Sequence, residues 1–167
     1  MISQSVTRRN FGARLASFIS GVGIARLLVP TMASAQETGD VQKLNYEGKP
    51  ETEKGFITPL IVHKGVIYIA GQGAHSHNKG DFAMDIETHT TKVMESVKTL
   101  VEAGGGTMDS ILQLTVYLTN IDNYDGLNKV FKTYFPNGGP ARTCVAVAAL
   151  PGQSLVEINC TAAVVRK

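Results

Sequence analysis

The amino-acid sequence predicts an α+β domain in which one mixed β-sheet carries two helices on one face. Three observations predict this fold. Short runs rich in β-branched residues lie near both ends of the domain, helical spacing occurs in two segments, and helices alternate with strands only in the middle. The resulting order, ββαβαββ, is typical of a sheet whose helices pack together on one side.

The domain is expected to begin with an irregular segment followed by two strands. Residues 36–55 are polar and rich in Gly, Glu and Lys, which predicts an irregular lead-in. The apolar runs at 56–62 and 66–72 predict two strands, and the HKG sequence at 63–65 is typical of a hairpin turn between them. Residues 73–84 are polar and predict a loop.

The middle of the domain reads helix, strand, helix. Asp85 is placed as an N-cap, and apolar residues follow it at helical spacing over about 18 residues. The glycines at 104–106 end this helix. Ile111–Thr119 is β-rich and predicts a third strand, after which a second helix begins near Asp122 and stops before Pro136.

The chain ends in two further strands, 143–150 and 155–165, which we interpret as a hairpin around Pro151-Gly152-Gln153. If residues 150–153 form a four-residue loop, residues whose numbers sum to 303 face each other.

This hairpin register has two consequences. It places Arg142 and Cys144 on the same face as Glu157 and Asn159, because side chains two apart share a face of a strand. It also points Cys144 and Cys160 to opposite faces of the sheet. We therefore predict no disulfide between them, even in an oxidising compartment.

One face of the predicted sheet has no helix to cover it. The last two strands and Ile111–Thr119 are apolar on both sides, so we expect the second face to be buried against another subunit. A closed oligomer, most simply a trimer, provides such burial.

Residues 1–35 follow the plan of an export signal: a basic start with Arg8 and Arg9, an apolar middle at 15–25, and the small-residue site Ala33-Ser34-Ala35. The Thr7-Arg8-Arg9-Asn10-Phe11 sequence resembles a twin-arginine signal, which predicts cleavage after Ala35 and a periplasmic protein without stable membrane association. The alternatives are an ordinary secretory signal or a retained anchor.

Removal of this segment changes the charge balance of the chain. Four of the 16 basic residues lie in it, which leaves 12 against 14 acidic residues. Residues 36–167 show no clustered basic run of the kind that a nucleic-acid surface needs, so an RNA- or DNA-binding role is disfavoured.

Arg142 is the charged residue in the stretch GGPARTCVAVAALP at 138–151. Its planar guanidinium can hold a carboxylate through two parallel hydrogen bonds, which a lysine cannot reproduce. The alternative is an arginine at a sheet edge or subunit interface, paired with a neighbouring acid for assembly alone.

Glu157 is the acidic residue of the final strands, in the apolar sequence LVEIN. A carboxylate there can position an attacking water or take up a proton. The alternative is a salt bridge to Arg142 without a catalytic part.

Three motifs resemble the RidA (YjgF) family of imine deaminases: AGQG at 70–73, the strand–helix segment at 115–135, and PARTCVAVAALPGQSLVEINCTAAV at 140–164. The resemblance covers about residues 41–167, with 56–167 as the RidA-like domain. It implies a chorismate-mutase-like trimer with active sites in clefts between subunits. It also implies a reaction without metal or organic cofactor, the hydrolysis of 2-imino acids to 2-keto acids and ammonia.

The resemblance assigns substrate binding to Arg142 and a catalytic role to both Arg142 and Glu157. It further implies that Cys144 lines the pocket, that Asn128 on the second helix helps to line it, and that the turn at 70–72 shapes its floor through Ala70, Gly71 and Gln72. The alternative for Asn128 is a solvated residue on the helix surface.

The sequence departs from the family at two positions. Ala70 stands where active members usually have serine, and Thr58-Pro59-Leu60 lacks the tyrosine that usually follows a Gly-Pro pair. Both departures remove a hydroxyl group.

These observations leave two hypotheses about function. The first is a homotrimeric deaminase of small imino acids, and the second is a non-catalytic protein that binds small carboxylates such as keto acids or acts as a holdase. His75 and His77 form an HxH pair without a nearby third ligand, so we expect no metal site.

Overall fold

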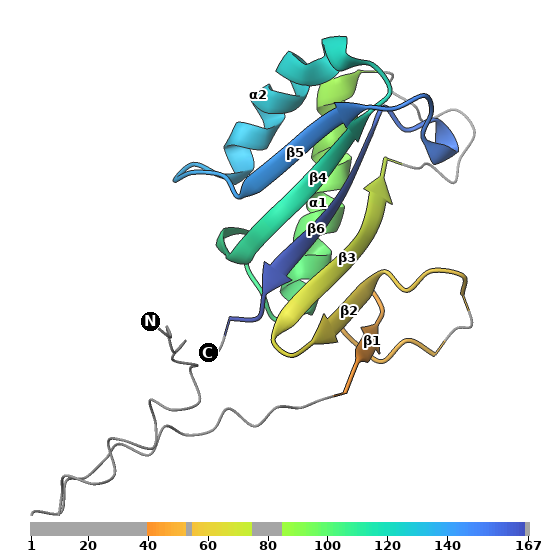
Figure 1. Cartoon of the computed structure of the whole chain (residues 1–167), viewed down its shortest axis with the longest axis vertical. Helices are drawn as coiled ribbons and strands as arrows, with labels where there is room; N and C mark the ends of the chain where they lie inside the picture. Colours follow the sequence, from red (N-terminus) through yellow and green to blue (C-terminus); the bar gives the residue numbers. More distant parts are fainter. Residues whose placement is uncertain (1–39, 53–54, 75–84, 166–167) are drawn as a thin grey trace, which may run out of the picture. The chain divides into compact units, whose positions relative to one another are not determined.

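Six strands form one mixed sheet in the computed structural model, which describes residues 40–52, 55–74 and 85–165 (Figure 1). The strands are β1 (Gln42–Leu44), β2 (Leu60–His63), β3 (Val66–Gly73), β4 (Ile111–Leu118), β5 (Ala141–Ala146) and β6 (Val156–Ala163). The helices are α1 (Ile86–Ala103) and α2 (Tyr124–Tyr134), with short 3-10 turns at Met108–Ser110, Ile121–Asn123 and Pro151–Gln153. The predicted α+β class, a mixed sheet with two helices, is confirmed. The export-signal segment lies outside the described residues.

The strand order in the sheet is β1-β2-β3-β6-β4-β5. β5 runs parallel to β4, whereas the other neighbours are antiparallel. The predicted hairpin between the last two strands is therefore wrong, because β4 lies between them. α2 supplies the long crossover that a parallel pair requires. The segment after β5 then crosses the end of β4, where the Val147 amide donates to the Leu118 carbonyl over 2.8 Å.

The β2–β3 hairpin forms as the sequence predicts. Lys64 and Gly65 make its two-residue turn, with φ of 49° and 76°, which is the left-handed geometry of a tight hairpin. The lead-in is less irregular than expected, since β1 lies in it and pairs with β2. β1 has no apolar alternation, so its sequence carries no strand signal. β2 begins only at Leu60, after Pro59, which has no amide hydrogen to donate.

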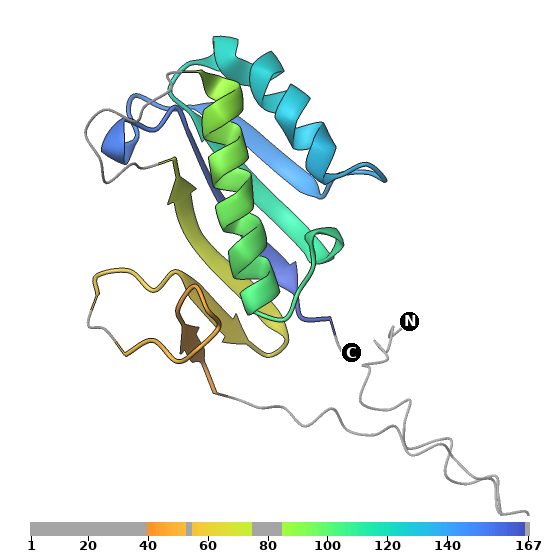
Figure 2. The same ribbon diagram turned by 180° about the vertical axis from the view of Figure 1, so that it is seen from behind.

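α1 has the predicted boundaries for the predicted reasons. The Asp85 side chain caps it by accepting from the Thr88 amide over 2.8 Å, and Gly104 follows its last residue. Its buried face packs on the sheet and consists of His89, Thr90, Val93, Met94, Val97, Leu100 and Val101. Figure 2 shows α1 and α2 together in front of the sheet, so both helices cover the same face.

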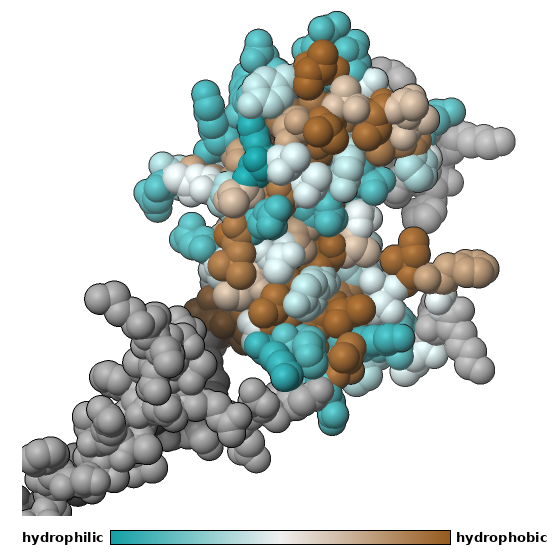
Figure 3. Space-filling model, viewed as in Figure 1, coloured by the Kyte–Doolittle hydropathy of each residue, from teal (hydrophilic) through white to brown (hydrophobic). Residues whose placement is uncertain are grey.

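No helix or strand among the described residues covers the opposite face of the sheet (Figure 1). We call it the open face; strand register places on it Tyr68, Gln113, Thr115, Tyr117, Thr143, Val145, Glu157, Asn159 and Thr161. Polar and apolar residues are interspersed there (Figure 3). The expectation that the central strands are apolar on both sides is wrong, because hydroxyl, amide and carboxylate side chains alternate with the buried Leu, Ile and Val residues.

Candidate active site

Arg142 lies on β5, on the face of the sheet that the helices cover. It pairs in register with the buried Leu114. Its guanidinium carbon lies 4.6 Å from the ring centre of Phe131 and 5.5 Å from that of Tyr124, and its Nη2 donates to the Tyr124 hydroxyl over 3.1 Å. Cation–π contacts of this kind stabilise a guanidinium without neutralising it. No salt bridge joins Arg142 to a carboxylate among the described residues.

Cys144 lies on the strand that carries Arg142, and Asn128 lies on the helix whose Tyr124 and Phe131 contact Arg142. Cys144 lies two residues after Arg142 and packs against the edge of the core. Burial raises the pKa of its thiol, and the charge of Arg142 opposes this only in part. A protonated thiol is a poor nucleophile, which fits a lining role. Asn128 follows Tyr124 by four residues and precedes Phe131 by three, so all three share one stripe of α2.

The two cysteines are free, but the geometric reason differs from the predicted one. Cys144 and Cys160 pair in register with Val116 and Leu114 of β4, so both lie on the helix-covered face. The intervening β4 separates their strands by roughly 10 Å. That separation exceeds the limit of about 7 Å between the Cα atoms of a disulfide. Burial raises the pKa of Cys160 to about 12.

Glu157 lies on the open face, where it pairs with Tyr117 of β4 and Gly73 of β3. It lines a cavity of about 380 Å³, the open-face cavity, which also includes Ala70 and Gly71. The side chain rests against Gly71, because a Cβ added there would lie 2.9 Å from Glu157 Cδ. A larger residue at position 71 would require the carboxylate to move from this position.

The structure therefore does not bring Arg142 and Glu157 together within one chain. The predicted shared face depended on a hairpin between β5 and β6, and the insertion of β4 between these strands removes that register. Arg142 faces the helices and Glu157 faces away from them. A direct salt bridge between the two is likewise absent among the described residues.

Ala70, Gly71 and Gln72 form an irregular turn within β3, where the register with β6 shifts between Ile69 and Gln72. Gln72 is buried, and its Nε2 donates to the Ala70 carbonyl over 2.9 Å and to the Gly71 carbonyl over 3.2 Å. A β-bulge of this kind re-aims a short segment of strand. Hydrogen bonds from the Gln72 side chain thus hold the turn that the sequence predicts at 70–72.

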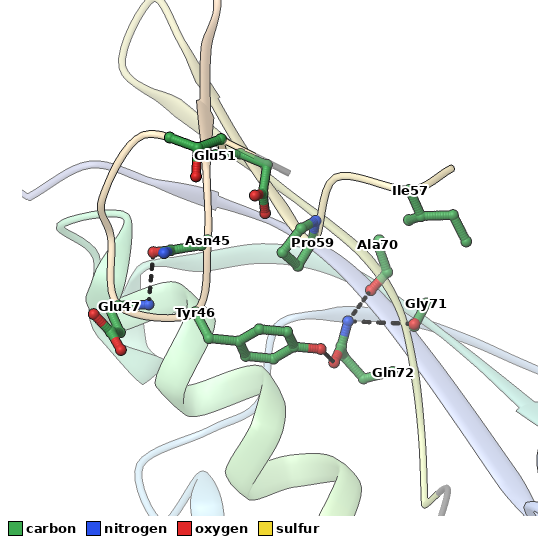
Figure 4. Close-up of a pocket in the computed structure, with 10 residues that line it drawn as sticks. Asn45, Tyr46, Glu47, Glu51, Ile57, Pro59, Ala70, Gly71 and Gln72 are labelled. Carbon is green, nitrogen blue, oxygen red and sulfur yellow. Dashed lines mark hydrogen bonds between the residues drawn. The ribbon is translucent and has the colours of Figure 1, made fainter. Parts of the chain in front are cut away.

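A second cavity, of about 600 Å³, shares Ala70 and Gly71 with the first (Figure 4). Tyr46 reaches into this region, and its hydroxyl donates to Gln72 Oε1 over 2.9 Å (Figure 4). A phenol therefore lies close to Ala70, where the sequence lacks a serine hydroxyl.

Four residues near these positions were missed by sequence reasoning as site residues: Tyr46, Tyr117, Tyr124 and Asn159. Tyr124 had a usable signal, its spacing of four from Asn128 on one helix. Asn159 also had one, its spacing of two from Glu157 on one strand. Tyr117 carried none, because its position beside Glu157 depends on the strand order. Tyr46 was hidden in a segment expected to be irregular.

Within the described part of the chain, no group of three or more His, Cys, Asp or Glu side chains is placed to hold a metal ion. His75 and His77 fall outside that part. Among the helices described, none combines the length and apolar character needed to cross a membrane.

The chain is thus a small α+β protein whose mixed sheet, covered by two helices, carries a glycine-containing bulge beside the Glu157 carboxylate. A family model described as Endoribonuclease L-PSP matches residues 47–164, and the chain belongs to that family, which includes the Rid (RidA, YjgF) proteins.

Solved structures agree with this assignment. The chain is 31% identical to YyfA of Yersinia pestis, a member of the conserved Rid family, over 74% of this chain and 98% of YyfA, with a TM-score of 0.62. It is 26% identical to E. coli TdcF with bound serine, over 69% and 91% of the two chains, with a TM-score of 0.61. It is 25% identical to the yeast protein YEO7, over 74% and 98%, with a TM-score of 0.66. Family membership supports a small-molecule-binding or deaminase role.

Proposed function

We propose that the protein hydrolyses small 2-imino acids to 2-keto acids and ammonia, in a cleft between subunits and without a cofactor. The observation that carries this proposal is the state of Arg142. Its guanidinium is held by two aromatic rings and one hydroxyl, and no carboxylate pairs with it among the described residues. An anionic ligand completes such a site.

Arg142 binds the substrate carboxylate. The guanidinium offers two parallel N–H donors to the two carboxylate oxygens, which fixes both the position and the direction of the substrate. The rings of Tyr124 and Phe131 restrict the guanidinium before the substrate arrives, so less orientational freedom is lost on binding.

Glu157 serves the hydrolysis. Its carboxylate orients a water and accepts a proton as the water oxygen bonds to the imine carbon. The resulting carbinolamine carries the oxygen and the nitrogen on one carbon. Glu157 returns the proton it accepted to the nitrogen. The hydroxyl proton follows to the nitrogen as the C–N bond breaks, so ammonia leaves and the oxygen forms the keto group.

Two copies of the chain build each such site in this proposal. Arg142 and Glu157 lie on opposite faces of one sheet, so they meet only if the β5 edge of one subunit approaches the open face of another. A homotrimer satisfies this arrangement through one repeated contact. The free edge of β5 and the uncovered open face support it.

The test measures keto-acid release from freshly generated 2-iminobutanoate. We expect Arg142→Ala and Glu157→Gln each to lower kcat/KM by about 100-fold or more, since each removes a charged contact to the reacting molecule. Lys132→Ala and Glu102→Gln change exposed charges on the helices and serve as matched controls. Equal rates for all variants and for buffer would exclude the deaminase.

The second candidate is a protein that binds small carboxylates without catalysis. It is favoured by the separation of Arg142 and Glu157 on opposite faces of the sheet within one chain. If Arg142→Ala abolishes binding of 2-oxobutanoate while the unaltered protein shows no turnover, this candidate replaces the first. We do not propose RNA as a substrate, although the family description names RNA cleavage, because residues 36–167 carry 12 basic and 14 acidic residues.

We also propose export to the periplasm through residues 1–35. Replacing Arg8 and Arg9 by lysine is expected to retain the protein in the cytoplasm, as measured by cell fractionation. Unchanged export would exclude the twin-arginine route.

A further inference from the structure

Asn159 carries a buried hydrogen-bond acceptor without a partner. Its Oδ1 is shielded from solvent, and no donor among the described residues reaches it. Buried side-chain acceptors are rarely left without a donor, and exceptions call for a physical account. Asn159 is therefore placed to receive a donor from outside the chain.

The position of Asn159 links it to Glu157. The two residues are separated by one position on β6, so both face the open side of the sheet. Both line the open-face cavity, where Tyr117 lies across from Glu157. The rest of the wall consists of Ile69, Ala70, Gly71, Val147, Ala149, Leu150 and Pro151.

This cavity presents acceptors in an apolar wall. The Glu157 carboxylate and the Asn159 amide oxygen accept hydrogen bonds, and the Tyr117 hydroxyl can donate or accept one. No lysine or arginine lines the cavity among the described residues. A ligand with an anionic end is disfavoured here, whereas a group with N–H donors fits. The imine nitrogen and the ammonia that leaves are such groups.

We propose that the open-face cavity binds the nitrogen end of the substrate, with Asn159 Oδ1 accepting an N–H hydrogen bond beside Glu157. This inference rests on the proposed function, in which Arg142 binds the carboxylate of the substrate. The open-face cavity then binds the other end of the same molecule. A keto acid has an oxygen in place of nitrogen and cannot donate to Asn159. The site therefore distinguishes the nitrogen-bearing ligand from its keto product.

The test compares two ligands that differ at this one group, L-2-aminobutanoate and 2-oxobutanoate. Their dissociation constants are measured by calorimetry on the full chain. Asn159→Leu removes the acceptor at similar volume, and we expect it to weaken the amino acid about tenfold while the keto acid changes less than about twofold. Asn159→Asp keeps an acceptor and is expected to retain amino-acid binding.

Thr161→Val provides a matched control on the same strand and face, since Thr161 does not line the cavity. It should leave both dissociation constants unchanged. The oligomeric state of each variant is measured by light scattering.

Three results overturn the proposal. They are an unchanged affinity of Asn159→Leu for the amino acid, an equal loss for both ligands, and a change of oligomeric state that accompanies the loss. An equal loss for both ligands, or a loss that accompanies a change of oligomeric state, would mean that Asn159 contacts a neighbouring subunit instead. Because binding is measured without turnover, a protein that discriminates the two ligands but hydrolyses no imine sustains this inference while the deaminase fails.

Discussion

The guanidinium of Arg142 is held by groups that carry no charge. Phe131 and Tyr124 contribute ring faces, and Tyr124 adds one hydroxyl oxygen. This arrangement orients the cation and leaves its charge available to a ligand. A carboxylate in the same place would orient it equally well but would compete with the substrate.

Tyr124→Phe tests the contribution of that hydroxyl. The ring remains, but the 3.1 Å hydrogen bond to Nη2 is lost, so the guanidinium gains freedom. We expect the dissociation constant of 2-oxobutanoate to rise by about three- to tenfold, the worth of one modest hydrogen bond.

Tyr134→Phe is the matched control on the same helix, where the phenol donates to Glu95 over 2.6 Å instead. It should leave keto-acid binding unchanged. Equal affinities of Tyr124→Phe and the unaltered protein would show that the rings alone orient Arg142.

Gly71→Ala tests the close approach of Glu157 to the bulge. An added Cβ would lie 2.9 Å from Glu157 Cδ, so the carboxylate has to move. We expect the rate of imine hydrolysis to fall by about tenfold or more, with keto-acid binding at Arg142 largely kept.

The matched control is Gly55→Ala, because its nearest neighbour to an added Cβ is the Ile57 carbonyl oxygen at 3.6 Å. A normal rate for Gly71→Ala would mean that Glu157 works equally well from a different rotamer.

At the residue scale, the sequence predicts which residues share a face when they lie on one strand or one helix. Arg142 and Cys144 share a face because they are two apart on β5, and Asn128 lies on the stripe of α2 that carries Tyr124 and Phe131. Prediction failed for the partnership of Arg142 with Glu157. That relation depends on which strand lies between two others, and no spacing within the sequence records this.

At the scale of elements, the segment between β5 and β6 is fixed by buried polar contacts. Ser154 is buried; its hydroxyl accepts from the Ala74 amide over 2.8 Å and donates to the Val156 carbonyl over 2.6 Å. His89 of α1 accepts from the Leu155 amide over 3.0 Å. These bonds set the start of β6 and thereby the position of Glu157.

Ser154→Ala is expected to lower the free energy of unfolding by about 1–3 kcal/mol, because the buried Ala74 amide loses its acceptor. Urea unfolding measures this change. Ser96→Ala is the control, since Ser96 bonds only the Lys92 carbonyl within α1, and alanine favours helix. Equal stability of both variants would contradict the assigned role of Ser154.

The sequence predicts elements whose signals are local. The Asp85 cap, the apolar spacing of α1 and the tight β2–β3 turn each lie within a few residues of what they determine. β1 has no such signal. Its three residues show no apolar alternation, and only the backbone pairing with β2 defines it as a strand. β5 pairs parallel with β4, and α2 forms the crossover between them. A hairpin between β5 and β6 would show the same apolar pattern in the sequence, so the pattern does not distinguish the two arrangements.

At the scale of the whole molecule, the opposite faces of Arg142 and Glu157 predict that two inactive variants restore activity when mixed. In a trimer, Arg142→Ala and Glu157→Gln subunits combine at random when they are coexpressed. A site regains both side chains when each of its two contributing subunits carries the intact residue, so we expect about a quarter of normal activity.

Imine hydrolysis by the purified mixture measures this recovery, and each variant alone is the control. A mixture as inactive as its components would place both residues of the site in one chain, against the register of the sheet.

The contact between Gly71 and Glu157 also constrains how the sequence can diverge. The acid occupies the space that a side chain at position 71 would take, so a larger residue at position 71 requires the Glu157 side chain to move or to be shorter. Related sequences with a larger residue at position 71 should carry a shorter one at position 157. Such sequences would lack the glutamate at position 157 and would therefore use the fold for a different function. The change would appear as paired substitutions on β3 and β6.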